Sequence, residues 1–162
     1  MKEFKTYYRS EIGLIEIAGT EDGIHSVNFV EEKSTSTPEI PSCLKECVRQ
    51  LDEYFKGKRK EFSLKMKLGG TDFQKKVWRE LMRIPFGKTV SYKDIAEAIG
   101  KKEATRAVGM ANNRNPIGII IPCHRVIGSD GKLVGYGGGL WRKEWLINHE
   151  RKVSSGDLMK LI

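Results

Sequence analysis

The stretch SYKDIAEAIGKKEATRAVGMANN, residues 91–113, decides the fold of the second half of this chain. Ser91 and Asp94 have the spacing of a capping box, with Asp in the place of the usual Glu or Gln. The helix that they begin is amphipathic and ends at Gly100. A second helix is predicted from about residue 103 to residue 112. Two short helices around a tight turn with a glycine are typical of a helix-turn-helix, which is a DNA-binding motif.

The second helix of this pair has unusually many small side chains and so a bare face. Small residues occupy positions Ala104, Ala107, Gly109 and Ala111. A glycine inside a helix costs about 1 kcal/mol relative to alanine, so another surface should approach closely enough to offset it. One long cation, Arg106, projects from this helix. The pattern predicts a helix that either presses against a core or enters a narrow groove.

The first seventy residues predict a small domain of a different kind. Three segments with strand composition are separated by the turn signals EIG and TEDG, and the spacing favours antiparallel hairpins. Apolar residues then recur at helical spacing, and LGGT at residues 68–71 is a plausible linker. The predicted strands are residues 5–10, 13–19 and 23–30, and the predicted helix is residues 43–55.

The fold class that follows is α+β. An N-terminal domain, residues 1–69, has a short antiparallel sheet and a helix. A mostly helical, winged-helix-like domain, residues 70–162, contains the helix-turn-helix. In this domain Thr71 is expected to cap a helix, and NPIGIIIP, residues 115–122, is expected to be a buried strand. The segment WRKEWLINHE, residues 141–150, predicts a closing helix.

The positive charge of the chain lies in one half. The net charge is +8. Residues 1–70 contain 12 Lys and Arg and 12 Asp and Glu, whereas residues 71–162 contain 17 and 9. A basic half favours a polyanionic partner such as DNA or RNA, and the alternative is a surface that is merely well solvated.

The chain shows no membrane or secretion signal. No stretch approaches the ~18 apolar residues of a membrane helix, and the N-terminus lacks the apolar core of a signal peptide. We therefore expect an intracellular, cytoplasmic protein whose three cysteines are free thiols. Cys43 and Cys47 are four residues apart, and without a second pair of ligands core packing is favoured over half of a metal site.

Cys123 and His124 follow the apolar run that ends at Pro122. A free cysteine has a pKa near ~8.5 and is a weak nucleophile at neutral pH unless a base or a positive field helps it. Neighbours in a strand point to opposite faces, so either the chain turns at Pro122 or the proton moves through a water molecule. Glu150 could orient the imidazole and complete a Cys–His–Glu relay. The alternative is that Cys123 is a core thiol, since free cysteines are among the most buried residues.

At these residues the sequence resembles the methylated-DNA–protein-cysteine methyltransferases, which repair 6-O-alkylguanine. The resemblance covers most of residues 71–162, whereas residues 1–70 resemble the family only in outline. Pro-Cys-His-Arg in this setting is a specific motif. The stretches that carry the resemblance are FQKKVW, IPFGKTVSYKDIA, ATRAVG, IPCHRVIG, GYGGGL and KEWLINHE.

The resemblance implies a catalytic role for several residues. Cys123 resembles the thiol that accepts the alkyl group, and His124 resembles the base that deprotonates it through a bound water. Glu150 resembles the carboxylate that orients the histidine. Tyr92 resembles the phenol that crowds the phosphate and protonates the guanine. Arg106 resembles the residue that fills the base stack when the damaged base leaves.

Other positions are implied as contacts to DNA or substrate. Asn115 resembles the turn residue that joins the DNA-binding helices to the active-site segment. The carbonyls of Cys123 and Val126 would accept from the guanine amino group, and the backbone near Gly137 would face the guanine oxygen. Arg125 is either a phosphate contact or part of a buried ion pair that fixes the turn, and the second interpretation is favoured. The remaining candidates are Lys93 and Ser129.

The expected function is transfer of an alkyl group from 6-O-alkylguanine, with 4-O-alkylthymine as a second candidate substrate. The base must leave the duplex to reach the thiol, and each molecule acts once. The partner is double-stranded DNA. A monomer without cofactor, metal, membrane or obligate protein partner is expected. One alternative is a non-enzymatic lesion binder, whose known forms lack the cysteine. The other is a generic Cys-His-Glu thiol hydrolase, which leaves the helix pair unexplained.

Overall fold

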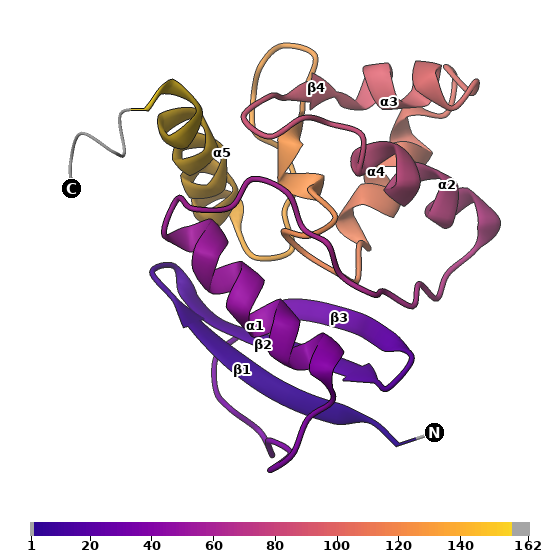
Figure 1. The fold of residues 1–162 in the computed structure, drawn as a ribbon. Coiled ribbons are helices and arrows are strands. Elements are labelled where there is room, and N and C mark those ends of the chain that lie inside the picture. Colours follow the sequence, from indigo (N-terminus) through magenta and orange to yellow (C-terminus); the bar gives the residue numbers. More distant parts are fainter. Residues whose placement is uncertain (1, 157–162) are drawn as a thin grey trace. The chain divides into compact units, whose positions relative to one another are not determined.

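The computed structural model describes residues 2–156 of the chain. The chain divides into two compact units, residues 1–69 and residues 70–162 (Figure 1). No helix within the described residues is long and apolar enough to cross a membrane. The elements in chain order are β1 (Phe4–Ser10), β2 (Gly13–Thr20), β3 (Gly23–Val30), α1 (Ser42–Phe55), α2 (Asp72–Leu81), β4 (Val90–Ser91), α3 (Tyr92–Ala98), α4 (Thr105–Asn113), η1 (Cys123–Arg125), β5 (Val126–Ile127) and α5 (Leu140–Ser155).

The first unit is a three-stranded antiparallel sheet with one helix. The strands follow one another in space in the order β1-β2-β3, with Tyr8 opposite Ile15 and Ile15 opposite Phe29. Figure 1 shows α1 lying across one face of this sheet, where it contacts all three strands. Leu44 and Leu51 of α1 are fully buried there. The predicted antiparallel sheet and its helix are confirmed.

The two cysteines of α1 are part of the packing of this unit. Cys47 is fully buried, and burial followed by the neighbouring Cys43 raises its pKa to about 12. The Cys43 thiol donates to the backbone oxygen of Thr20 over 3.3 Å. Within residues 2–156 no group of three or more His, Cys, Asp or Glu side chains is placed to hold a metal ion. Cys47 therefore behaves as a small core side chain, whereas Cys43 is only partly buried.

The second unit begins with the helix that Thr71 was expected to cap. The Thr71 side chain accepts from the backbone of Gln74, and the Gln74 side chain accepts from the backbone of Thr71, which forms a complete capping box. On the buried face of α2, Trp78 donates its indole N–H to the backbone oxygen of Ala111 over 2.8 Å. This bond fixes α2 against α4, because it satisfies two buried polar groups at their contact.

The helix-turn-helix is formed by α3 and α4. Ser91 and Asp94 form the expected capping box at the start of α3, and Gly100 follows its end with a φ of 74°. α4 begins at Thr105, two residues later than predicted. The reason is a tight turn in which the Ala104 N–H donates to the oxygen of Lys101. The predicted helix pair is otherwise confirmed.

The predicted buried strand over residues 115–122 is wrong. Ile117, Ile119 and Ile121 are buried as expected, but the chain folds there into successive turns. Ile119 has a φ of 70°, which is rare for a β-branched residue. The Ile121 N–H donates to the oxygen of Ile117, so the segment satisfies its backbone locally instead of in a sheet. Apolar composition alone does not separate a buried strand from a buried turn.

A short parallel pairing connects the helix-turn-helix to the segment after these turns. β4 pairs with β5, with Val90 opposite Val126 and Ser91 opposite Ile127. α3 begins directly after β4, and η1 ends directly before β5. The closing helix α5 contacts η1. The backbone thus brings three separated parts of the chain to the Cys123 turn.

Gly109 of α4 offers a test of the helix packing. A Cβ added there would lie 3.8 Å from the Tyr92 ring, which is ordinary van der Waals contact. We expect Gly109→Ala to increase the free energy of unfolding by about 0.5–1 kcal/mol, because the helix no longer contains a glycine. The measurement is the urea unfolding midpoint.

Gly135 provides the opposite case. Its φ is 59°, and an added Cβ would lie 2.8 Å from the Asn113 side chain. Gly135→Ala should therefore destabilise the protein. Equal effects of the two substitutions would contradict the packing described for α4.

Candidate active site

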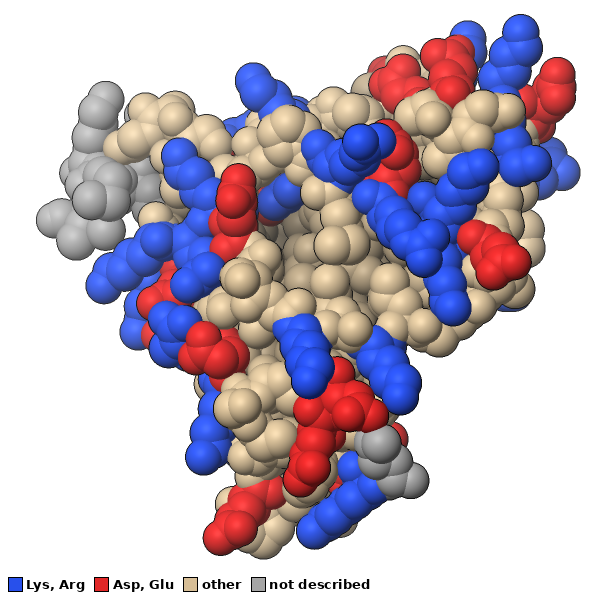
Figure 2. Space-filling view, turned by 45° about the vertical axis from the view of Figure 1, so that its right-hand side comes forward, with Lys and Arg blue, Asp and Glu red and all other residues tan. Residues whose placement is uncertain are grey.

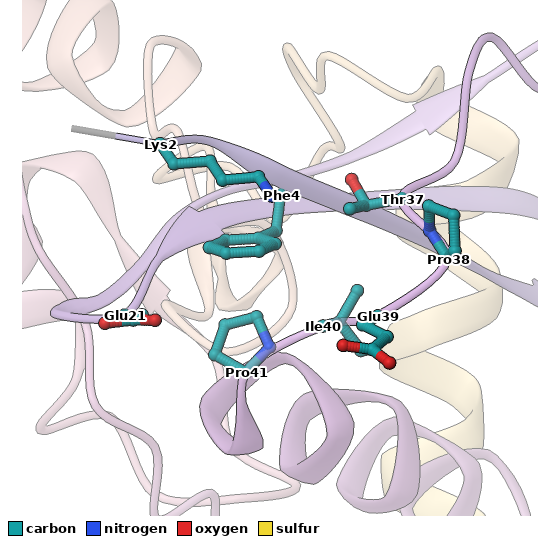
Figure 3. Close-up of a pocket in the computed structure, with 8 residues that line it drawn as sticks. All are labelled: Lys2, Phe4, Glu21, Thr37, Pro38, Glu39, Ile40 and Pro41. Atoms are coloured by element: carbon teal, nitrogen blue, oxygen red, sulfur yellow. The ribbon is translucent and has the colours of Figure 1, made fainter.

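A cavity of about 530 Å³ opens on the first unit (Figure 3). At the edge of this cavity, the Lys2 ammonium lies 5.2 Å from the centre of the Phe4 ring. None of the described residues that line it is a cysteine or a histidine. It therefore offers no pairing of a nucleophile with a base. The lining residues are Lys2, Phe4, Glu21, Thr37, Pro38, Glu39, Ile40 and Pro41.

A cavity of about 330 Å³ on the second unit lies beside the helix-turn-helix. Its wall combines the α4 surface, the Tyr92 side chain and the backbone of Val134 and Gly135. Arg106 and Met110 are exposed on α4 at this cavity. Of the four small residues predicted on this helix, Gly109 is the one that lines the cavity, whereas Ala111 is buried in the core. The remaining lining residues are Thr105 and Asn113.

Cys123 lies at the start of the η1 turn, directly after Pro122, and is 7% exposed. The approach to this turn is held by Asn115. Its side-chain amide donates to the oxygen of Ile121 over 2.7 Å, and its side-chain oxygen accepts from the N–H of Ile117 over 3.0 Å. Both polar groups of Asn115 are thus used inside the protein. The residue holds this turn in place and is only partly accessible from outside.

The Cys123 thiol is not ionised by its surroundings alone. Burial raises its pKa above the ordinary value, while hydrogen bonding from Asn115 and the charge of Lys143 act in the opposite direction. Buried cysteines in apolar surroundings are usually inert. The thiol therefore needs a proton acceptor at the moment of reaction.

Glu150 of α5 joins several parts of the site through one buried carboxylate. It lies 2.6 Å from His124 Nε2, and it accepts from Arg125 Nε over 2.8 Å and from Arg125 Nη2 over 3.1 Å. The N–H of Gly87 donates to the same carboxylate over 3.2 Å. Arg125 also donates to the oxygen of Ile84 over 2.7 Å. The two residues after Cys123 are thereby fixed to α5 and to the loop before β4.

Glu150 is held ionised. Burial by itself would raise its pKa, but the charge and hydrogen bond of His124, followed by those of Arg125, hold the pKa well below its usual range. An ionised carboxylate only accepts hydrogen bonds, so the His124 nitrogen that faces it carries a proton. The second ring nitrogen, Nδ1, is buried and has no hydrogen-bond partner among the described residues. Nδ1 is therefore the His124 nitrogen left for the chemistry of the site.

Lys143 is a functional-site residue that the sequence reasoning missed. Its side chain is fully buried, and its ammonium donates to the oxygens of Val134 over 2.8 Å and Gly135 over 3.2 Å. It also lies 3.3 Å from the Tyr92 hydroxyl, which itself donates to Val134 over 2.7 Å. Burial lowers the Lys143 pKa to about 8, against the opposing effect of Cys123. Lys143 precedes Glu150 by seven residues, so a helical projection would have placed both on one face.

The other predicted residues separate into an exposed and an interior group. Arg125 is 6% exposed and forms an ion pair with Glu150, which agrees with the ion-pair interpretation. Val126 is also buried. The exposed group is Lys93, Arg106, Ser129 and Gly137. A side chain added at Gly137 would meet no neighbour within 4 Å, so the loop leaves open space there.

Lys and Arg side chains cover much of the visible face in Figure 2, with Asp and Glu among them. In the second unit most of the basic side chains are exposed, including Lys101, Lys102 and Arg114 on the helix-turn-helix. Among the described residues of this unit, Lys75 and Arg142 are partly buried, and the buried Arg125 and Lys143 lie at the candidate site. The positive surplus is therefore available to an anionic partner.

Family models and known proteins agree on one relationship. Residues 72–152 match the DNA-binding domain of 6-O-methylguanine DNA methyltransferase, and residues 4–68 match its ribonuclease-like domain. A methylated-DNA–protein-cysteine methyltransferase of Methanosarcina barkeri is 53% identical over 87% of this chain and 92% of its own length. One of Mycolicibacterium paratuberculosis is 46% identical over 98% of both chains.

Solved structures show the same relationship in three dimensions. The O6-methylguanine methyltransferase of Mycobacterium tuberculosis matches with a TM-score of 0.86 and 42% identity, over 99% of this chain and 100% of its own. A structure of the Mycobacterium tuberculosis protein in complex with DNA matches with a TM-score of 0.83 and 46% identity, over 91% and 92% of the two chains. The chain belongs to the methylated-DNA–protein-cysteine methyltransferase family.

Proposed function

We propose that this protein repairs alkylated duplex DNA by moving the alkyl group from the 6-oxygen of guanine to Cys123. The observation that carries the proposal is the placement of the thiol. It stands at the start of a fixed turn, one residue before a histidine whose Nε2 lies 2.6 Å from an ionised, buried carboxylate. A nucleophile, a base and a group that orients the base are thus adjacent, which is the arrangement of covalent catalysis.

The transfer is a single displacement at carbon. The Cys123 sulfur forms a bond to the alkyl carbon while the bond from that carbon to the guanine oxygen breaks, and its electron pair goes to the oxygen. The thiol proton goes to His124, and Glu150 stabilises the resulting imidazolium. The guanine takes a proton from the Tyr92 hydroxyl, and Lys143 lies 3.3 Å away to return one. The product is a thioether, and no group in this site would hydrolyse it, so each molecule acts once.

The helix-turn-helix binds the duplex and so brings the damaged base to the Cys123 thiol. The bare face of α4 fits the minor groove, where a bulky side chain would collide with the walls. The exposed Arg106 fills the place of the base that leaves the stack. Exposed cations on the same unit bind phosphates without reading sequence. Lys93 and Ser129 are proposed as contacts of this kind, and the loop at Gly137 as a wall beside the flipped guanine. The transfer uses no cofactor, and the protein is proposed to act in the cytoplasm as a monomer.

The first test is the mass of the intact protein after incubation with a duplex that contains one 6-O-methylguanine. The wild type should gain the mass of one methyl group on Cys123 and then stop. Cys123→Ala should gain none while still binding the duplex. Repeated turnover, or a methyl group on Cys43 or Cys47, would contradict the proposal.

A second test separates base flipping from chemistry. Arg106→Ala should slow repair of a duplex by at least tenfold more than it slows reaction with free 6-O-benzylguanine, because only the duplex requires unstacking. Lys58→Ala removes an exposed charge from the first unit and serves as the control. Equal losses on both substrates would place Arg106 in the pocket or the fold.

A third test concerns the relay. Glu150→Gln keeps the shape of the side chain but removes the charge that stabilises the imidazolium. We expect slower transfer, within or below the ~10²–10⁴-fold range of general-base catalysis. The pH at which Cys123 reacts with iodoacetamide should rise. Glu144→Gln, an exposed change on the same helix, is the control.

The same variant has a predictable effect on stability. The folded pKa of Glu150 lies below its unfolded value near ~4.3, so its contribution is complete above that pH and is lost as the pH falls through the folded value. Glu150→Gln should therefore unfold more easily at pH 7, and the difference from the wild type should shrink toward pH 3. A lower melting temperature with an unchanged transfer rate and thiol titration would remove Glu150 from the relay.

A further inference from the structure

Two buried polar atoms near Cys123 lack a hydrogen-bond partner among the described residues. They are Asn112 Oδ1 and His124 Nδ1, and within residues 2–156 they are the two buried side-chain nitrogen or oxygen atoms without one. Asn112 is 1% exposed and His124 is fully buried. An unsatisfied buried acceptor costs about 1–3 kcal/mol, so two of them beside one nucleophile call for a functional explanation.

Both atoms belong to residues attached to Cys123. His124 follows it in the chain. Asn112, at the end of α4, donates its side-chain amide to the Cys123 backbone oxygen over 3.4 Å. This contact also identifies the amide atom that faces Cys123 as the Asn112 nitrogen, because the Cys123 backbone oxygen can only accept a hydrogen bond. The Asn112 oxygen is therefore a free acceptor.

His124 also has a buried nitrogen, Nδ1, without a hydrogen-bond partner among the described residues. Its Nε2 faces the Glu150 carboxylate over 2.6 Å, so Nδ1 is the nitrogen that accepts in the neutral ring, which is the form able to take up the thiol proton. His124 makes no direct hydrogen bond to the Cys123 sulfur in this structure. The thiol proton must therefore cross a gap to reach Nδ1. A water molecule has two O–H donors and lone pairs that accept, and a buried water typically makes about three hydrogen bonds.

We propose that Asn112 is a positioning residue that holds, together with His124, the water through which Cys123 loses its proton. This inference rests on the proposed function and assigns a further residue to it. The water donates one hydrogen to His124 Nδ1 and the other to Asn112 Oδ1, and its lone pair accepts from the Cys123 thiol. During reaction the thiol proton moves to the water, and the water passes a proton to Nδ1. The water is regenerated, and the products are a thiolate and an imidazolium.

Asn112 contributes by orientation. With one O–H held by the Asn112 oxygen, the water cannot rotate to direct both hydrogens elsewhere, and its lone pair stays directed at the sulfur. A group held in the reactive geometry avoids the entropy cost of finding it. Tyr92, Tyr136 and Lys143 also face Cys123. The Lys143 ammonium is only a donor. The Tyr92 hydroxyl is already used, because it donates to Val134 and accepts from Lys143.

The test compares two buried amides. Asn112→Leu removes the free acceptor at similar volume. Gln50→Leu is the matched control in the first unit, where both amide groups are paired with the backbone of Ser63 over 3.0 Å. Gln50 is 2% exposed, so both substitutions alter the interior. The readouts are the melting temperature and the rate of Cys123 alkylation by iodoacetamide against pH, with the modified residue identified by mass.

We expect opposite patterns. Asn112→Leu should slow alkylation of Cys123 near pH 7 by about tenfold, a fraction of the general-base effect, and shift the profile to higher pH. Its melting temperature should change little, since the variant loses one long hydrogen bond to the Cys123 backbone and one contact to a water molecule. Gln50→Leu should lower the melting temperature and leave the alkylation profile unchanged. Transfer from free 6-O-benzylguanine should fall in Asn112→Leu by the same factor as alkylation.

Two results would overturn the inference. If Asn112→Leu impairs transfer from 6-O-benzylguanine but not alkylation by iodoacetamide, the Asn112 oxygen contacts the base instead of a water. If only the melting temperature falls, Asn112 has a purely structural role. Methyl transfer from DNA to the wild type, measured alongside, distinguishes failure of this inference from failure of the repair function, because the alkylation assay contains no nucleic acid.

Discussion

The structure around Cys123 depends on one buried carboxylate. Glu150 binds His124 and Arg125 through charged hydrogen bonds and also accepts from the Gly87 backbone. Burying such a charge is costly unless its partners are equally well placed. Two of those partners are the residues directly after the thiol. The ion pairs that make α5 part of the fold therefore also fix the orientation of the base.

A second set of contacts, centred on Asn115, explains why the turn before Cys123 can take an unusual backbone. Ile119 stands at a positive φ, and conformations of this kind cost about 1–3 kcal/mol. They persist where neighbouring contacts determine them. Here the Asn115 side chain bridges Ile117 and Ile121, and the buried isoleucines on either side leave no room for an extended chain.

The sequence predicted the elements better than their connections. Capping boxes at Thr71 and Ser91 are local patterns, and both helices began where these patterns placed them. The buried strand before Pro122 was wrong, because its conformation depends on the side chain of Asn115 and on packing from other elements. The partners of Glu150 come from positions 87, 124 and 125, and proximity of this kind is set by the tertiary fold. Lys143 lies on a face that the helical period identifies, but its contact with Tyr92 crosses 51 residues.

The two-residue pairing of β4 with β5 fixes the distance between the helix-turn-helix and Cys123. α3 starts where β4 stops, and the Cys123 turn stops where β5 starts. The reach from a bound duplex to the sulfur is thus set by main-chain hydrogen bonds and not by the side chains that touch DNA. Side chains on the outer surface of α4 can therefore change without altering the backbone path from α3 to the Cys123 turn.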